Sequence, residues 1–383
     1  MKTIEREVIV VGAGPGGSAC AAYLARAGVD VLLLDKEIWP RDKPCGDGQT
    51  ARAIPHIKEL GFFDEFASKG FMSQGSLWTA PNHSTIEFPA GGGYCTPRRI
   101  FDDEVRHTAM RFGAEMIENA WVYDVILEDG FVKGVKAKIN GEYLELRSKL
   151  VVGADGSHSL IAQKIGMFHD TDENACVVGR CYVQVDPKDF AGKVEIHLDK
   201  DVMPGYVWIF PERNNIVNLG LGFQRSLYNK STGVKTLQET LRKWIEESPF
   251  GKPVRGKKWI GEFRGWRIPN DMGVDRKDNY VNGCMLIGDA ASLIVPFSGE
   301  GVGPAMDSAL IVSDVAQTAL KKNDFSGEVL KEYKTRYDEK NVQPVMMAWK
   351  MNAMLANQDA VNAMFLPENR QKLAAAMGIA HHI

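Results

Sequence analysis

The chain has 383 residues, of which 44% are hydrophobic and 25% are charged, so it can bury a substantial core. Its 46 basic and 49 acidic residues give a net charge of −3, which argues against a strong electrostatic hold on nucleic acid, and we expect no nucleic-acid partner. The 38 glycines exceed the usual share of about 7% and gather in a few short motifs, which therefore direct the search for a functional site.

The first 36 residues predict a strand, a glycine turn, a helix and a second strand. Residues 8–11 and 31–34 are valine, isoleucine and leucine runs, typical of parallel strands buried on both faces. Between them, residues 12–17 read Gly-Ala-Gly-Pro-Gly-Gly, and an aspartate ends the second strand. In this dinucleotide-binding fingerprint, the first glycine permits a tight turn, the second lets the backbone approach a pyrophosphate, and the third lets helix and sheet pack. We expect cofactor binding by Gly12, Gly14, Pro15, Gly17, Asp35 and Lys36.

Two later segments end like the first strands, whereas two other segments differ from them in composition. Residues 150–156 and 285–291 are apolar runs that end in a glycine and an acid, whereas residues 76–97 and 177–270 hold short aromatic and β-branched stretches typical of an antiparallel sheet. We therefore predict an α/β fold with α+β insertions, in which a Rossmann-like domain is interrupted by an antiparallel-sheet domain. The predicted division is 1–75, 98–176 and 271–335 for the nucleotide-binding domain, 76–97 and 177–270 for the substrate-binding domain, and 336–383 for a C-terminal helical region.

Three further features concern location and metals. The longest uncharged run, residues 8–25, is interrupted by four glycines and a proline, so we expect no membrane-spanning helix. The start of the chain lacks the apolar core and cleavage site of a signal peptide, so we expect a cytoplasmic protein. No two of the six cysteines have Cys-x-x-Cys spacing, so we expect reduced thiols and no metal site.

Three motifs carry a family resemblance: Gly-Ala-Asp-Gly at 153–156, Gly-Asp-Ala-Ala at 288–291 and Arg-Arg-Ile-Phe-Asp at 98–102. They resemble motifs of the large flavoprotein family that includes para-hydroxybenzoate hydroxylase, squalene epoxidase, flavin-dependent halogenases and geranylgeranyl reductases. The resemblance implies that the cofactor is FAD and that the interrupted domain is a FAD-binding domain. It further implies that Gly288 and Asp289 bind FAD, that Asp155 supports the site and that Arg98 lies along the flavin.

Other motifs resemble those of geranylgeranyl reductases in particular. Residues 45–48 read Cys-Gly-Asp-Gly, residues 206–211 read Tyr-Val-Trp-Ile-Phe-Pro and residues 297–303 read Phe-Ser-Gly-Glu-Gly-Val-Gly. The resemblance implies that the cysteine motif lies on the substrate side of the flavin, that the aromatic pair lines the pocket above it, and that the loop amides cover its pyrimidine edge. It assigns Cys45, Tyr206 and Trp208 as catalytic residues and Cys45, Gly46, Gly299, Gly301 and Val302 as cofactor-binding residues.

Two details depart from this pattern. The signature proline should precede Tyr206 by three residues, but Met203 stands there and the proline is Pro204. The halogenase motif Gly-Trp-x-Trp-x-Ile-Pro falls at the same place, although Tyr206 and Phe210 differ from it. A flavin-dependent monooxygenase or halogenase, acting with oxygen on an aromatic or apolar small molecule, is therefore the alternative, and a flavin-binding module without turnover is a third.

The resemblance implies a FAD-dependent reductase of prenyl double bonds on a lipid, quinone or prenylated pigment, with electrons from NAD(P)H or a ferredoxin-like donor protein. An isolated C=C is not electrophilic, so its reduction needs a hydride and a proton delivered in a dry, apolar place. Cys45 is the candidate residue near the reacting bond, as proton donor or as shaping group. Arg41 and Lys43 would favour a thiolate if they approached it, which argues against the acid role.

The substrate also bears on membrane contact. A polyprenyl lipid resides in a bilayer, so we expect transient, peripheral contact with the membrane. The most plausible contact in the tail is Trp349, Met351, Met354, Leu355 and Phe365, whose spacing fits core packing equally well.

Overall fold

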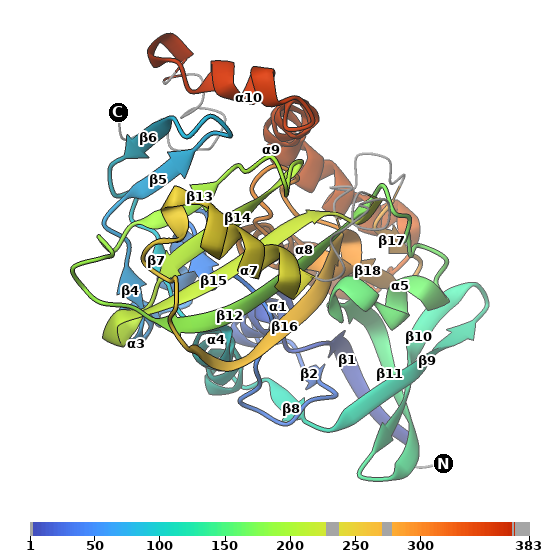
Figure 1. Cartoon of the computed structure of the whole chain (residues 1–383). Coiled ribbons are helices and arrows are strands. Elements are labelled where there is room, and N and C mark those ends of the chain that lie inside the picture. The colour runs from blue at the N-terminus through green and yellow to red at the C-terminus, as the bar shows by residue number, and fades with distance from the viewer. Residues whose placement is uncertain (1–2, 227–236, 270–277, 370, 372–383) are drawn as a thin grey trace.

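The first half of the molecule is a mainly parallel sheet covered by helices. The computed structural model describes residues 3–226, 237–269, 278–369 and 371. Its eight-stranded sheet has the order β17-β18-β11-β1-β2-β8, and it also includes β10, antiparallel to β11, and β9, antiparallel to β10 (Figure 1). The strands are β1 (Thr3–Val11), β2 (Val31–Leu34), β8 (Glu115–Ile117), β9 (Ala120–Glu128), β10 (Phe131–Ile139), β11 (Glu142–Gly153), β17 (Tyr280–Val281) and β18 (Cys284–Leu286).

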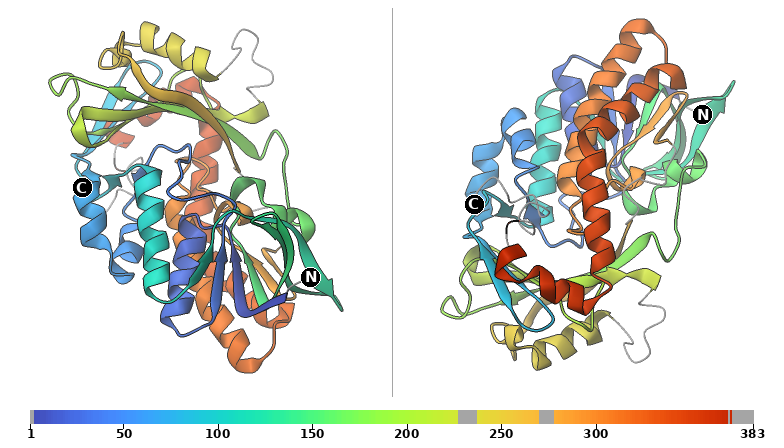
Figure 2. Two further views of the ribbon diagram at one scale, coloured as in Figure 1. Left: turned by 90° about the horizontal axis from the view of Figure 1, so that it is seen from below. Right: turned by 90° about the horizontal axis from the view of Figure 1, so that it is seen from above.

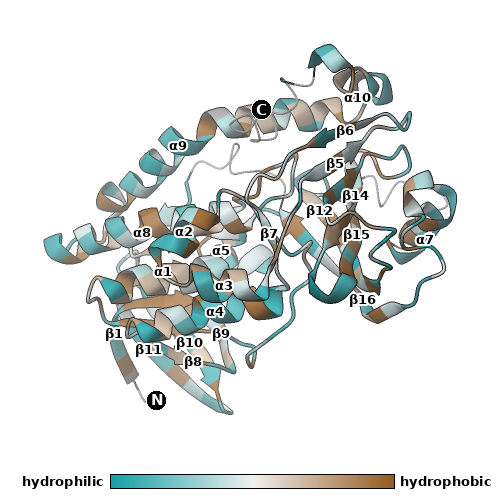
Figure 3. Cartoon of the chain, turned by 90° about the vertical axis from the view of Figure 1, so that its left-hand side faces the viewer, coloured by the Kyte–Doolittle hydropathy of each residue, from teal (hydrophilic) through white to brown (hydrophobic). Residues whose placement is uncertain are grey.

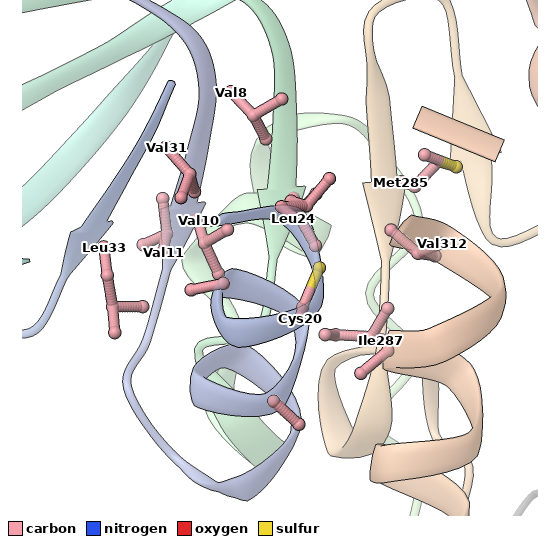
Figure 4. Close-up of a cluster of buried hydrophobic side chains, with 14 of the residues drawn as sticks. Val8, Val10, Val11, Cys20, Leu24, Val31, Leu33, Met285, Ile287 and Val312 are labelled. Carbon is pink, nitrogen blue, oxygen red and sulfur yellow. The ribbon is translucent and has the colours of Figure 1, made fainter. Parts of the chain in front are cut away.

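The core of this half lies between the sheet and helices α1 and α8. Figure 4 shows Val10 of β1 beside Cys20 and Leu24 of α1 (Pro15–Arg26), with Val312 of α8 (Val302–Lys322) farther along the same layer. All four side chains are buried, as expected where helices cover the face of a parallel sheet. The glycine-rich start of α1 lets it approach α8 closely. The other helices of this half are α2 (Ile54–Glu59), α3 (Phe63–Lys69), α4 (Arg98–Arg111) and α5 (Leu160–Lys164).

The second half is a seven-stranded sheet of order β16-β12-β15-β14-β13-β5-β6, drawn above the first sheet in the left view of Figure 2. All its pairings are antiparallel except that of β13 with β5. Helix α7 (Leu237–Glu247) packs on it through Leu241, Trp244 and Ile245. The strands are β5 (Ser76–Thr79), β6 (Thr85–Phe88), β12 (Ala175–Gln184), β13 (Val194–His197), β14 (Gly205–Pro211), β15 (Ile216–Gln224) and β16 (Trp259–Pro269), and a small sheet joins β3 (Gly48–Gln49), β7 (Tyr94–Cys95) and β4 (Phe71–Met72).

These two sheets confirm the predicted α/β fold with an antiparallel insertion. The domain limits themselves stay a prediction. The limit at 270/271 lies outside the described residues, and the one at 335/336 falls inside the continuous helix α9 (Gly327–Met354).

Helix α9 connects the two halves. It starts beside β17 and runs to α10 (Gln358–Met364), next to β5 and β6 (Figures 2 and 3). There Met351, Leu355 and Phe365 are buried against the second sheet, so core packing is the outcome for these three residues of the tail. Met354 remains exposed. Within the described ranges, no helix is both long enough and apolar enough to span a membrane.

Candidate active site

A large cavity lies between the two halves of the molecule. Its volume is about 1820 Å³, well above the roughly 300–1,000 Å³ of an ordinary ligand pocket, so it has room for a dinucleotide and a second molecule. Every residue that the sequence analysis assigned to the site lines it, apart from Gly17. These lining residues are Gly12, Gly14, Pro15, Asp35, Lys36, Cys45, Gly46, Arg98, Asp155, Tyr206, Trp208, Gly288, Asp289, Gly299, Gly301 and Val302.

The turn between β1 and α1 forms an anion cradle. Gly12 has φ +101°, and a Cβ there would lie 2.4 Å from the Ala154 carbonyl oxygen, so only glycine fits. No side chain caps α1 at Gly14, which leaves the amides of its first turn available to a phosphate. Gly17 faces away from the cavity and packs on the Gly12 carbonyl, where a Cβ would lie only 1.8 Å from the oxygen. It shapes the cradle without lining it.

Carboxylates surround the rest of the dinucleotide-sized space. Asp35 accepts hydrogen bonds from the amides of Ala13 (2.7 Å) and Glu37 (2.9 Å), which hold its carboxylate in the cavity wall beside the cradle. Asp155 accepts from the Leu160 amide at 2.7 Å and so fixes the start of α5. Among the described residues no donor binds the carboxylate of Asp289, so it can accept from a ribityl hydroxyl. These positions fit FAD.

Arg98 stands beside Cys45 and is held by a buried ion pair. Its Nε and Nη2 donate to Asp102 at 2.6 and 2.8 Å, and Arg41 Nη1 donates to the same carboxylate at 2.8 Å. Burial acts to raise the pKa of Asp102, but the two guanidinium groups hold it below its usual range. Arg41 is therefore committed to Asp102, and Lys43 lies 3.8 Å from the ring centre of Trp266.

The thiol of Cys45 is neutral in this setting. Burial raises its pKa, and the opposing effect of Arg98 is smaller. Arg41 and Lys43, which would favour a thiolate if they approached Cys45, instead contact Asp102 and Trp266. A protonated thiol at the cavity wall is compatible with the role of proton donor.

Asn218, which the sequence analysis did not single out, ties the cysteine turn to the aromatic wall. Its Oδ1 accepts from Trp208 Nε1 at 2.9 Å, and its Nδ2 donates to the Cys45 carbonyl and to Asp47 Oδ2, both at 2.7 Å. Asp47 has φ +62° and is fully buried, and it also accepts from the Tyr182 hydroxyl at 2.5 Å. In the sequence, the one feature that marks Asn218 is its position as a polar residue inside the apolar run of β15.

An apolar chamber adjoins the cysteine turn. Tyr206 and Trp208 point from β14 into the cavity with ring centres 6.0 Å apart, and the Tyr206 hydroxyl donates to the Ser298 carbonyl. Burial raises the pKa of Tyr206, so this phenol is neutral. Trp78 stacks on Phe297 at 5.9 Å. The remaining apolar lining of the cavity here includes Val178, Val194, Ile196, Phe210, Met347 and Ala348.

A dinucleotide cradle that opens into an apolar, aromatic chamber defines the class of protein, a flavin-dependent oxidoreductase. A sequence model of the family described as "FAD binding domain" matches residues 5–342. The chain is also 30% identical to digeranylgeranylglycerophospholipid reductase 1 of Methanopyrus kandleri over 99% of both chains. It therefore belongs to the geranylgeranyl reductase family of FAD-dependent oxidoreductases.

Two further comparisons bear on substrate and fold. The chain is 31% identical to a menaquinone reductase of Mycobacterium tuberculosis over 81% of its own length and 76% of that protein. A solved structure, a geranylgeranyl bacteriochlorophyll reductase-like protein from Thermoplasma acidophilum, matches with a TM-score of 0.85 at 23% identity over 98% of this chain and 92% of the other. The similarity to this solved structure shows a shared fold.

Proposed function

We propose that this protein saturates C=C bonds in a prenyl chain of the geranylgeranyl type with a hydride from reduced FAD. The observation that carries the proposal is the continuity of the cavity, which leads from the Gly12 cradle past Cys45 to the chamber of Trp78, Tyr206 and Phe297. The names of the two relatives, a digeranylgeranylglycerophospholipid reductase and a menaquinone reductase, support a prenylated lipid as substrate.

The chain supplies the binding surfaces and a proton. The amides of Gly14 and Gly16 would hold the pyrophosphate of FAD, Asp35 a ribose and Asp289 the ribityl chain. When bound and reduced, FAD supplies the hydride. The aromatic chamber excludes water and orients the alkene, which loses its π bond as one carbon receives the hydride and its neighbour a proton.

Cys45 is the proposed source of that proton. Its thiol is protonated before the reaction, and Arg98 beside it stabilises the thiolate that remains afterwards. A proton from solvent then restores the thiol. Asn218 holds the backbone carbonyl of Cys45, so the thiol is presented from a fixed turn.

Electrons for the flavin come, in this proposal, from NAD(P)H or a ferredoxin-like donor protein, and the substrate comes from a membrane. Helix α9, which lines part of the cavity, carries exposed apolar side chains that suit transient contact with a lipid surface. They are Val342, Met346, Met347 and Met354.

Anaerobic turnover tests the proposal. The FAD-loaded protein is reduced without oxygen, mixed with extracted prenyl lipids and analysed by mass spectrometry. We expect lipids that gain two hydrogens per reduced double bond while the flavin is reoxidised. Reoxidation by air alone, with oxygen consumption and no lipid change, would support the monooxygenase or halogenase alternative instead.

A further inference from the structure

One face of α9 forms a wall of the cavity, and its character changes along the helix. Lys340, Asn341, Pro344, Met347 and Ala348 all line the cavity, and their spacing places them on one side of the helix. From the first to the last is about 12 Å at roughly 1.5 Å per residue. The wall thus passes from cationic to apolar within the length of a small lipid headgroup and the start of its chain.

The apolar end of this wall is continuous with the chamber. Ala348 is buried in the same hydrophobic cluster as Trp78 and Phe297, and Tyr206 packs against that cluster. Met347 lines the cavity and is about half exposed, so it stands where the chamber opens beside α9. A prenyl chain entering here would meet apolar surface from the opening to the reacting site.

At the cationic end of the wall, the side chains of Arg52 and Lys340 both bind the carboxylate of Asp307. Arg52 Nε donates to Asp307 Oδ2 at 2.5 Å, and Lys340 Nζ donates to Asp307 Oδ1 at 2.6 Å. Arg52 Nη2 also donates to Asn341 Oδ1. Asp307 is 2% exposed, whereas 24% of the Arg52 side chain and 57% of the Lys340 side chain remain exposed. The carboxylate therefore lies beneath the two cations and presents them to the cavity.

The two cations at this end of the cavity, Arg52 and Lys340, are accompanied by two acids, Asp307 and Glu300. Arg52 and Lys340 carry two charges against one on Asp307, and His56 binds the same carboxylate at 2.9 Å. The other acid here, Glu300, accepts from the Thr50 hydroxyl, and burial raises its pKa. An arginine has five N–H donors and an ammonium three, so both groups retain donors beyond those used on Asp307 and Asn341.

We propose that Arg52 and Lys340 form a headgroup site that binds a phosphate ester of the lipid substrate, with the prenyl chain lying along Met347 and Ala348. This inference rests on the proposed function and narrows its substrate class to anionic prenyl phospholipids over neutral prenyl quinones. A guanidinium and an ammonium side by side are the pair best suited to phosphate oxygens, one as a planar fork and the other as a point charge.

Kinetics of the Lys340→Gln holoenzyme on two substrates test the headgroup site. Anaerobic turnover is measured in neutral detergent micelles with a digeranylgeranylglycerophospholipid and with menaquinone. We expect KM for the phospholipid to rise about tenfold with little change in kcat, because one charge-assisted contact is lost. KM for menaquinone should stay unchanged. Lys340→Arg should keep the wild-type KM values.

A control on the same helix separates the site from general surface charge. Lys334 pairs with Asp338 outside the cavity, so Lys334→Gln should change neither KM. Inorganic phosphate identifies the source of the anion: competition with the phospholipid in the wild type, lost in Lys340→Gln, shows a site for phosphate itself. A KM effect without such competition shows a site that needs the whole lipid.

Two results would overturn the headgroup site. Unchanged KM for the phospholipid in Lys340→Gln is one, and an equal loss for both substrates, which would make Lys340 a structural link between α8 and α9, is the other. If the wild type reduces neither lipid, the proposed function itself fails. If it reduces both and the variant does not discriminate between them, only the headgroup site fails.

Discussion

Replacing Asn218 by alanine breaks the link between the cysteine turn and the aromatic wall. The change removes the acceptor of Trp208 Nε1 and the donor to both the Cys45 carbonyl and Asp47. Since Asn218 is fully buried, water does not take over these contacts. Asp47 keeps its bonds from Tyr182 and from the Arg98 amide, so Trp208 and the cysteine turn bear most of the loss.

The expected loss of stability is large but leaves the protein folded. A buried polar group left without a partner costs about 1–3 kcal/mol, and two such groups give about 2–6 kcal/mol for Asn218→Ala. A typical domain has about 5–15 kcal/mol in total. The effect on catalysis follows from position, because a shift of about 1 Å at a reacting group lowers the rate about a hundredfold. We therefore expect kcat to fall at least tenfold.

Urea unfolding of the FAD-loaded protein and anaerobic turnover measure the two effects. Gln224 lies on the same strand, nearer its end, and donates to the Glu173 carbonyl at 2.7 Å. Gln224→Ala is therefore the matched control, with an expected loss below about 1 kcal/mol and normal kcat. An Asn218→Ala protein with wild-type stability and wild-type kcat would refute the positioning role.

Three other changes test the cofactor site, the proton donor and the charge cluster. Gly12→Ala should abolish FAD retention, measured as lost flavin absorbance, because the added Cβ would clash with Ala154. The control Gly28→Ala, at φ +81° with open space around it, should keep the flavin. Cys45→Ala should lower kcat about 10²-fold or more if the thiol is the proton donor; a variant with full activity and normal product would remove it from the mechanism. Burial opposes the shift, but His56, Arg52 and Lys340 hold the pKa of Asp307 well below its usual range. The ionised Asp307 therefore stabilises the folded state above about pH 4, and this stabilisation is lost as the pH falls further. We expect Asp307→Asn to lower the free energy of unfolding by about 3–5 kcal/mol at neutral pH and by clearly less near pH 3. An equal cost at both pH values in urea unfolding would contradict this.

Local patterns in the sequence were sufficient for the nucleotide half. The strand, turn and helix around Gly12, and Asp35 at the end of the next strand, depend on short-range rules of backbone conformation. The cavity wall carries motif glycines because the backbone must approach a large ligand closely there, and a side chain would block that approach. Motif resemblance likewise located Cys45, Tyr206 and Trp208, although these belong to different elements.

Long-range packing decided what the motifs could not. The helical period of α9 marks its faces, yet only the approach of the second sheet determined that Met351 is buried while Met347 borders the cavity. The raised pKa of Cys45 comes first from its burial, which depends on the packed fold, and the sequence alone does not specify that Arg41 donates to Asp102.

The sequence by itself determined the flavin-binding fold and most of the residues that line its cavity, because those depend on local backbone geometry and on contiguous motifs. Tertiary structure alone brought Asn218 to the cysteine turn across 171 to 173 residues of chain, Arg52 to Asp307 across 255 residues, and Lys340 to Asp307 across 33 residues. Hydrogen bonds and ion pairs between such distant residues exist only after both sheets and α9 have packed. For that reason the polar end of the cavity, which bears on the choice of lipid, could not be found from sequence spacing.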